Sequence, residues 1–248
     1  MNIISLIWDE GLYRPLFNIL VFLYNTIPGH DIGVAIIVLT ALLRFALWPL
    51  SQKSIKSQKA LQELQPKMNE IKKKYKNNKE KQAQATMEFY KKNKINPLGS
   101  CLPMLIQLPI LIALYRVLRD TVGSDQLNAL YYFILDPGRI DPYFLGLIDL
   151  SKPDRFVLPI LAGGLQFIQT KMLMSRQKKN QGQKTGIEKM LGSQMTYFMP
   201  LITVFFAFTL PAGLPLYWIV TTLIAILQQW LIMRKRGEEN TTPKLKKA

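Results

Sequence analysis

Apolar residues in this chain are gathered into five long runs, and polar or basic segments separate them. The runs cover residues 32–50, 98–118, 156–174, 190–210 and 214–233. Each has about the 20 residues that a helix needs to cross the hydrocarbon core of a bilayer. Because backbone groups in hydrocarbon must find partners within their own segment, each run is predicted to be a transmembrane helix. The expected fold class is therefore all-α, a polytopic membrane protein with five transmembrane helices.

A sixth stretch, residues 12–27, is a weaker candidate because Arg14, Pro15, Asn18 and Asn25 interrupt it. This mixture favours an amphipathic helix lying in the membrane interface over a span. The chain start lacks a basic region and a small-residue cleavage site, so a cleavable signal peptide is not expected.

Lysine and arginine alternate between sparse and dense along the segments that join the runs. The basic-poor segments are residues 1–31, with Arg14 as their one basic residue, and residues 116–155, with five basic and six acidic residues. The basic-rich segments are residues 51–97, with 13 lysines and four glutamates, residues 171–193, with six basic residues and one acidic residue, and residues 234–248, with six basic and two acidic residues. Basic residues gather in cytoplasmic loops. The alternation predicts five crossings, with the N-terminus outside and the C-terminus in the cytoplasm. A sixth crossing at residues 12–27 would place the basic-poor N-terminus inside.

The predicted divisions follow from these two patterns. They are an outer N-terminal segment with an interfacial helix (1–30), spans at 31–50, 98–118, 156–175, 190–210 and 214–233, a cytoplasmic helical hairpin (51–97), an outer loop (119–155), a cytoplasmic loop (176–189), a tight outer turn (211–213) and a basic cytoplasmic tail (234–248).

The hydrophilic segment 51–97 has a helical pattern of its own. Its apolar residues repeat every three or four positions, first as Leu61, Leu64, Met68, Ile71 and Tyr75, and again, after Asn77 and Asn78, as Ala83, Met87 and Tyr90. Such spacing places each set on one helical face. The segment is predicted to be an antiparallel hairpin, either a solvated linker or a docking arm for anionic lipid headgroups or ribosomal RNA. No base-reading motif accompanies the lysines, so sequence-specific nucleic-acid binding is not expected.

Arg44 is the one charge well inside an apolar run, and burying it near the bilayer centre costs about 2.5–3.5 kcal/mol or more. One interpretation is snorkelling of the side chain to the cytoplasmic headgroups. The other is a water-filled cavity open to the cytoplasm. No carboxylate lies in the middle of any run, and the runs contain many glutamines and threonines, which favours a polar interior.

Composition removes several functional classes. The formal net charge is +16, with 49% hydrophobic and 19% charged residues, so charge and apolar residues are strongly segregated. A single cysteine (Cys101) and a single histidine (His30) leave no disulfide, histidine metal cluster or catalytic triad. No phosphate-binding loop motif is present. The chain is not expected to be an enzyme or to need a cofactor.

Three segments together resemble the YidC family of membrane protein insertases: LLRFALWPLSQKSIKSQKALQELQPKMNEIKKKYK, INPLGSCLPMLIQLPILIALYRVL and LPAGLPLYWIVTTLIAILQQWLI. The likeness covers about residues 10–235. It implies five transmembrane helices around a hydrophilic groove that is open to the cytoplasm and to lipid. It also implies that the protein inserts and helps fold new proteins in the bacterial plasma membrane, alone or beside the Sec translocon.

The resemblance also implies site residues and partners. Arg44 matches the family's groove arginine, and Gln107, Gln166, Gln169 and Trp218 are expected in the groove lining. The hairpin matches a substrate-receiving hairpin, and the basic tail and loops match a ribosome-contacting region. Neither a large outer domain before the arginine span nor a lipoprotein signal is expected, unlike in two common variants of the family.

Two other functions stay open on residue chemistry alone. A small solute transporter or channel would also place polar residues within spans, although no inverted repeat is visible. A membrane tether for ribosomes would use the hairpin and tail without a groove.

Overall fold

The computed structural model describes residues 6, 8–93, 102–121, 129–174 and 186–239. These residues are mostly helical. In chain order the elements are η1 (Asp9–Tyr13), α2 (Arg14–Thr26), α3 (Ile32–Ala46), α4 (Trp48–Lys74), α5 (Lys79–Lys92), α6 (Leu102–Thr121), β1 (Tyr143–Phe144), β2 (Ile148–Asp149), α7 (Val157–Met174), α8 (Gly186–Thr209) and α9 (Gly213–Glu239). The expected all-α class is confirmed, and a two-stranded antiparallel ribbon, β1–β2, is the one sheet among these residues.

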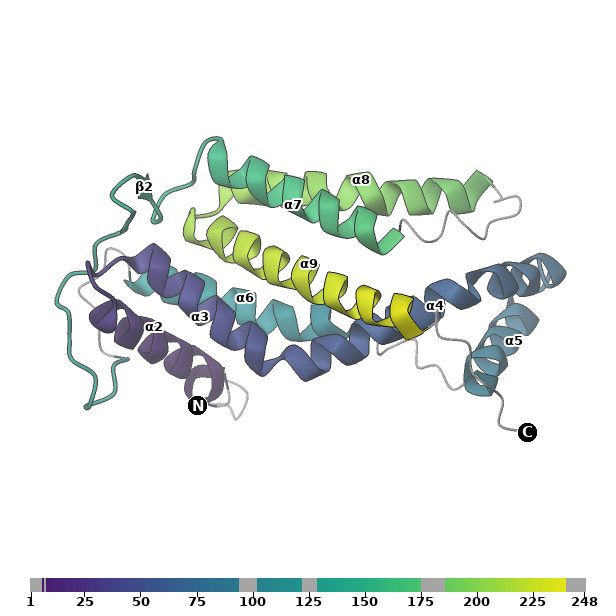
Figure 1. Ribbon diagram of the computed structural model, residues 1–248, viewed down its shortest axis with the longest axis horizontal. Helices are drawn as coiled ribbons and strands as arrows, with labels where there is room; N and C mark the ends of the chain where they lie inside the picture. The colour runs from purple at the N-terminus through teal and green to yellow at the C-terminus, as the bar shows by residue number, and fades with distance from the viewer. Residues whose placement is uncertain (1–5, 7, 94–101, 122–128, 175–185, 240–248) are drawn as a thin grey trace.

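The helices form an elongated bundle with α9 in its middle (Figure 1). α7 and α8 pack together on one side of α9, and α3 packs on the other side, followed by α6 and α2. Buried apolar side chains of α2, α3, α6 and α9 form one continuous core; its fully buried members include Phe17, Ile36, Leu39, Leu114 and Leu214. The hairpin of α4 and α5 extends from one end of the bundle, while the β1–β2 ribbon lies at the other end.

The predicted first span is broken. α3 ends at Ala46, α4 begins at Trp48, and the two helix axes meet at 65°. Pro49 has no N–H, so the carbonyl of Phe45 cannot receive its helical hydrogen bond, and the proline ring clashes with that carbonyl. The apolar run to residue 50 is therefore not one straight helix, and the hairpin begins within α4.

Helix α2 is built into the bundle rather than resting on its surface. Phe17, Leu20 and Val21 are fully buried against the core. Asn18, also buried, donates to the carbonyl of Ala129 (2.9 Å) and accepts from the N–H of Tyr131 (2.7 Å). The sequence predicts the amphipathic pattern of this helix but not that its apolar face packs against the protein core. Its position in the membrane interface stays a prediction.

Residues 129–156, which precede α7, close over the helix ends at the ribbon end of the bundle. Asp31 caps α3 by accepting from Val34 N–H (3.0 Å), and its second oxygen accepts from Leu145 N–H (2.6 Å) in the ribbon turn. At the start of α9, Gly213 N–H donates to the carbonyl of Leu150 (3.1 Å). This segment therefore holds the starts of α3 and α9 together.

The two hairpin helices are present, with Asn78 as the N-cap of α5: its side chain accepts from Lys81 N–H at 2.9 Å. Met68 of the predicted α4 stripe is buried. Ala83, Met87 and Tyr90 share one face of α5 as predicted, and on this face Ala83 and Met87 are exposed while Tyr90 is half-buried. Gln82 donates to the carbonyl of Lys72 (3.1 Å) and so joins α5 to α4.

Among the described residues, one helix by itself, Gly213–Ile232 within α9, is long and apolar enough to cross a bilayer. The bent pair Ile32–Ala46 and Trp48–Gln58 provides a second if counted as one crossing. Shorter apolar helices run over Val157–Leu173 and Tyr197–Thr209. Five crossings thus stay a prediction. The predicted tail beyond residue 239, most of the loop 176–189, and Cys101 lie outside the described residues.

Candidate functional site

Arg44 lies in the last turn of α3, one turn before the bend to α4. Its side chain is half-buried, and no salt bridge joins it to a carboxylate within the described part of the chain. Its electrostatic neighbour is the phenol of Tyr217 on α9. An unpaired guanidinium at such a site is favourable only if water or a transient anionic group can reach it.

Gln107 and Tyr217 connect α6 to α9 beside this arginine. The Gln107 side-chain amide donates to the Tyr217 hydroxyl at 2.5 Å. Gln107 is half-buried, whereas Tyr217 is almost fully buried. Arg44, Gln107 and Tyr217 come from three different helices, so the tertiary fold collects them into one polar cluster, which we call the Arg44 cluster.

Sequence reasoning missed Tyr217 and Thr40 near the cluster, whereas Thr221 is one of the span threonines that favoured a polar interior. Thr40 lies one turn before Arg44, is buried, and donates to the carbonyl of Ile36 (2.6 Å). Thr221 lies one turn after Tyr217 and is buried, with its hydroxyl close to the Tyr217 phenol. The i, i+4 spacing from Arg44 to Thr40 was the available signal, since it places both on one helical face. Tyr217 gave no such signal because aromatic residues are common in membrane helices.

The other three predicted groove residues do not join the Arg44 cluster. Gln166 and Gln169 are half-buried on α7, and the carbonyl of Gln166 accepts from Thr170 (2.8 Å). Trp218 is half-buried and packs against the apolar core. No described hydrogen bond connects any of these three side chains to Arg44. Their role in a groove stays a prediction.

Other candidate sites offer less chemistry. Depressions of about 620 and 570 Å³ lie on the segment before α7 rather than at Arg44. Their linings include Lys152 and Arg155 in the first and Arg139 and Asp141 in the second. Within the described residues, no group of three or more histidine, cysteine or acidic side chains is placed to hold a metal ion.

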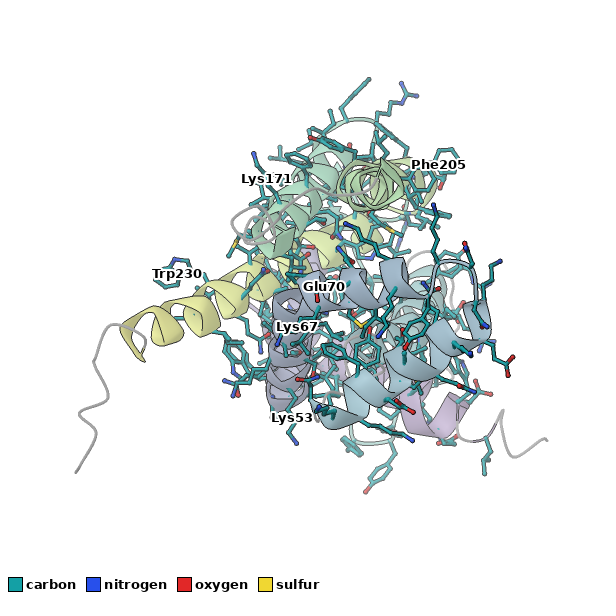
Figure 2. All side chains as sticks on the ribbon, turned by 90° about the vertical axis from the view of Figure 1, so that its right-hand side faces the viewer. Lys53, Lys67, Glu70, Lys171, Phe205 and Trp230 are labelled. Carbon is teal, nitrogen blue, oxygen red and sulfur yellow. The ribbon has the colours of Figure 1, made fainter. Side chains whose placement is uncertain are left out.

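Large apolar side chains are exposed along α7 and α8 and at the residue before α7. They include Phe156, Ile160, Leu161, Tyr197, Phe198, Leu201, Phe205 and Phe206. Figure 2, viewed toward the hairpin end, shows Phe205 projecting outward from α8, while Lys53, Lys67 and Glu70 lie on α4. Exposed apolar faces of this extent are typical of surfaces that meet lipid or another protein.

Comparison with known proteins gives one consistent family. The family model described as "60Kd inner membrane protein" matches residues 22–239. A protein of Syntrophus aciditrophicus named "Membrane protein insertase YidC" is 40% identical over 229 residues. Proteins with the same name from Fusobacterium nucleatum and Alcanivorax borkumensis are 37% and 38% identical over 229 and 240 residues.

The matches differ in how much of each relative they cover. They include 92%, 90% and 92% of this chain, but only 37% of the Syntrophus and Alcanivorax proteins. In the Fusobacterium relative the match covers 98% of the protein. The matched region is thus a whole protein in one relative and about a third of the others.

Proposed function

This chain belongs to the YidC family of membrane protein insertases, and on that basis we propose that it inserts newly made proteins into the bacterial inner membrane and helps them fold there. The relatives named as insertases match about 90% of this chain, and the family model, over residues 22–239, includes all three helices of the Arg44 cluster. The function needs no bond-making chemistry, so the chain acts without a cofactor and not as an enzyme.

The observation that carries the proposal is a half-buried arginine with polar neighbours and no carboxylate partner within the described chain. A charge in such a place attracts opposite charge more strongly than it would in bulk water, because the effective dielectric constant is lower. Arg44 would therefore draw in acidic side chains of a substrate tail. Gln107 and Tyr217 would offer hydrogen bonds to its backbone.

The driving force for insertion is the substrate's own apolar span. A groove that holds water on the cytoplasmic side shortens the low-dielectric path that the hydrophilic tail must cross. The span then leaves into lipid because its apolar surface is removed from water. No nucleotide is needed. The contact with Arg44 must be transient, since a deep binding minimum would trap the substrate.

The proposed topology follows the charge pattern, with the N-terminus outside, five crossings and the C-terminus in the cytoplasm. The α4–α5 hairpin then lies in the cytoplasm. Its lysines suit anionic lipid headgroups, at about 1 kcal/mol each near the surface. The ribosome, through the basic loops and tail, and the Sec translocon are further proposed partners.

A charge series at position 44 tests the proposal. Arg44→Lys, Arg44→Ala and Arg44→Glu variants are reconstituted into proteoliposomes, and insertion of a single-span substrate with an acidic outer tail is measured. Lys should retain most activity, Ala should lose much of it, and Glu should lose more. The same substrate with a neutral tail should be much less sensitive. Arg155→Ala, at an exposed position away from the cluster, is the control.

The outcomes separate the competing functions. Full activity of Arg44→Ala on the acidic tail contradicts the electrostatic role. An equal defect with both tails indicates a structural role for Arg44 instead. A wild-type protein that conducts solutes into liposomes but inserts nothing is a transporter or channel, and one that only binds ribosomes is a tether.

A further inference from the structure

Gln228 makes a hydrogen bond that joins the bundle to the hairpin. It lies on α9 and is 2% exposed. Its side-chain amide donates to the backbone carbonyl of Trp48 at 3.1 Å, across 180 residues of sequence. Trp48 is the first residue of α4, directly after the bend. The bond therefore fixes the start of α4 to α9.

Local contacts at the bend are few: Leu47 donates to the Leu43 carbonyl and accepts from Ser51 N–H, and the Phe45 and Trp48 rings stack with centroids 5.9 Å apart. Pro49 prevents α3 from continuing, and Leu47 takes a conformation (φ −85°, ψ 2°) outside the regular helix. Small rotations at Leu47 would swing α4 without breaking any helix. The carbonyl of Trp48 has two lone pairs, so it can accept from Gln228 and still serve its own helix.

Helix α4, whose direction this bend sets, is long. α4 has 27 residues, which at about 1.5 Å per residue is about 40 Å. A change of about 10° at Leu47 would then move the far end of α4 by about 7 Å. A single contact near the pivot thus has a large effect on where the hairpin lies.

Gln228 also shares a face of α9 with the Arg44 cluster. At about 3.6 residues per turn, Tyr217, Thr221 and Gln228 lie within about 40° of one another around the helix. Tyr217 accepts from Gln107 toward one end of this face, and Gln228 holds Trp48 toward the other. Arg44 precedes Trp48 by one turn. One rigid helix therefore contacts both the cluster and the root of the hairpin.

We propose that Gln228 is a positioning residue that fixes the direction of the α4–α5 hairpin relative to the Arg44 cluster. This inference rests on the proposed insertase function, in which the hairpin receives a substrate and the cluster draws in its tail. A hairpin held in one direction releases the substrate where its tail can reach the Arg44 cluster. Without the bond, the hairpin samples a wider range of directions and delivers substrate to the cluster less often.

The neighbouring Gln229 provides a matched control. It is 3% exposed, and its side-chain nitrogen has no hydrogen-bond partner among the described residues. Gln228→Met and Gln229→Met remove the same amide from adjacent buried positions while keeping the side-chain length. Gln228→Glu, a third variant, replaces the donor nitrogen by an oxygen.

Distance measurement between two spin labels reports the hairpin direction in lipid bilayers. With Cys101 replaced by serine, labelled cysteines are placed at the exposed positions Lys79, at the start of α5, and Leu223 on α9. Gln228→Met and Gln228→Glu should broaden the distance distribution by several ångströms, and Gln229→Met should leave it unchanged. Insertion should fall severalfold only in the Gln228 variants, at melting temperatures similar to that of Gln229→Met.

Three results would overturn the inference. The first is an unchanged distance distribution in both Gln228 variants. The second is equal broadening in Gln229→Met, which would indicate general loosening. The third is broadening without loss of insertion, which would separate hairpin direction from function. The distances do not depend on insertion activity. They therefore test the role of the Gln228–Trp48 hydrogen bond even if the proposed function fails.

Discussion

The ring of Phe144 lies against the backbone of Gly33. A Cβ placed on Gly33 would be 2.1 Å from Cδ2 of Phe144, far inside van der Waals contact. Asp31, two residues earlier, bonds to Val34 on the helix side and to Leu145 on the ribbon side. The absence of a side chain at position 33 is therefore what allows the β1–β2 ribbon to rest on α3.

Gly33→Ala is expected to destabilise the protein. The methyl group must displace the Phe144 ring, and overpacking of this kind typically costs about 1–3 kcal/mol. The apparent melting temperature in detergent should fall. Gly164→Ala, where a Cβ meets nothing within 4 Å inside α7, should be neutral or stabilising because alanine favours helix. Equal melting temperatures for the two variants would contradict the predicted contact.

Loss of the Asn18 side chain should loosen the segment after α6. Asn18→Leu leaves the half-buried N–H of Tyr131 without its partner, at a cost of about 1–3 kcal/mol, and leaves the Ala129 carbonyl with only the Arg14 Nε donor at 3.3 Å. Asn25→Leu removes a single bond to the Leu135 carbonyl at an exposed position and should cost much less. Melting temperatures in detergent compare the two, and a larger drop for Asn25→Leu would refute this account.

Tyr217→Phe should weaken the Arg44 cluster. The variant removes the acceptor of the Gln107 amide, and a typical net hydrogen bond contributes about 0.5–1.5 kcal/mol. A modest fall in melting temperature and a measurable loss of insertion are expected. Tyr197→Phe, at an exposed position on α8, is the control and should behave like wild type in both measurements. Wild-type insertion in Tyr217→Phe would place this hydroxyl outside the substrate path.

Alkaline pH should act on the protein through Tyr13. Burial, and then the hydrogen bond to Asp120 and its charge, raise the pKa of Tyr13 to about 12, from an ordinary value of 10.0. The folded protein therefore holds this proton more tightly than the unfolded chain does. The resulting stabilisation is complete below pH 10 and is lost as pH rises through about 12.

Phenolate absorbance during an alkaline titration measures this effect. The step that Tyr13→Phe removes belongs to Tyr13, and it should occur near pH 12 in the wild-type protein. Asp120→Asn should shift that step downward, because the negative charge is gone while burial remains. A step at the same pH in Asp120→Asn would show that Asp120 does not perturb Tyr13.

Several features of the fold were predictable from local sequence. The apolar runs and the amphipathic pattern of residues 12–27 correspond to helices. Asn78, expected to separate the two hairpin helices, caps the start of the second one. Arg44 stood out because an isolated charge in an apolar run is costly. These features depend on hydrophobic periodicity, capping and residue type, which act over a few turns of chain.

Other features depended on contacts between distant segments. Pro49 marks a break in the helix, but neither the 65° bend nor the role of Gln228 follows from it. The exposure of Ala83 and Met87 does not follow from their spacing, because spacing alone does not say which face of α5 meets α4. Tyr217 entered the cluster only through Gln107, 110 residues away.

The sequence by itself determined where the helices form and that burying the charge of Arg44 in lipid would be costly, since local spacing and composition decide both. The tertiary structure alone decided which polar groups meet that charge and how the hairpin is held. A buried donor or acceptor can bond with any partner of suitable geometry, and only the packed arrangement of α3, α6 and α9 selects Gln107 with Tyr217 and Gln228 with Trp48.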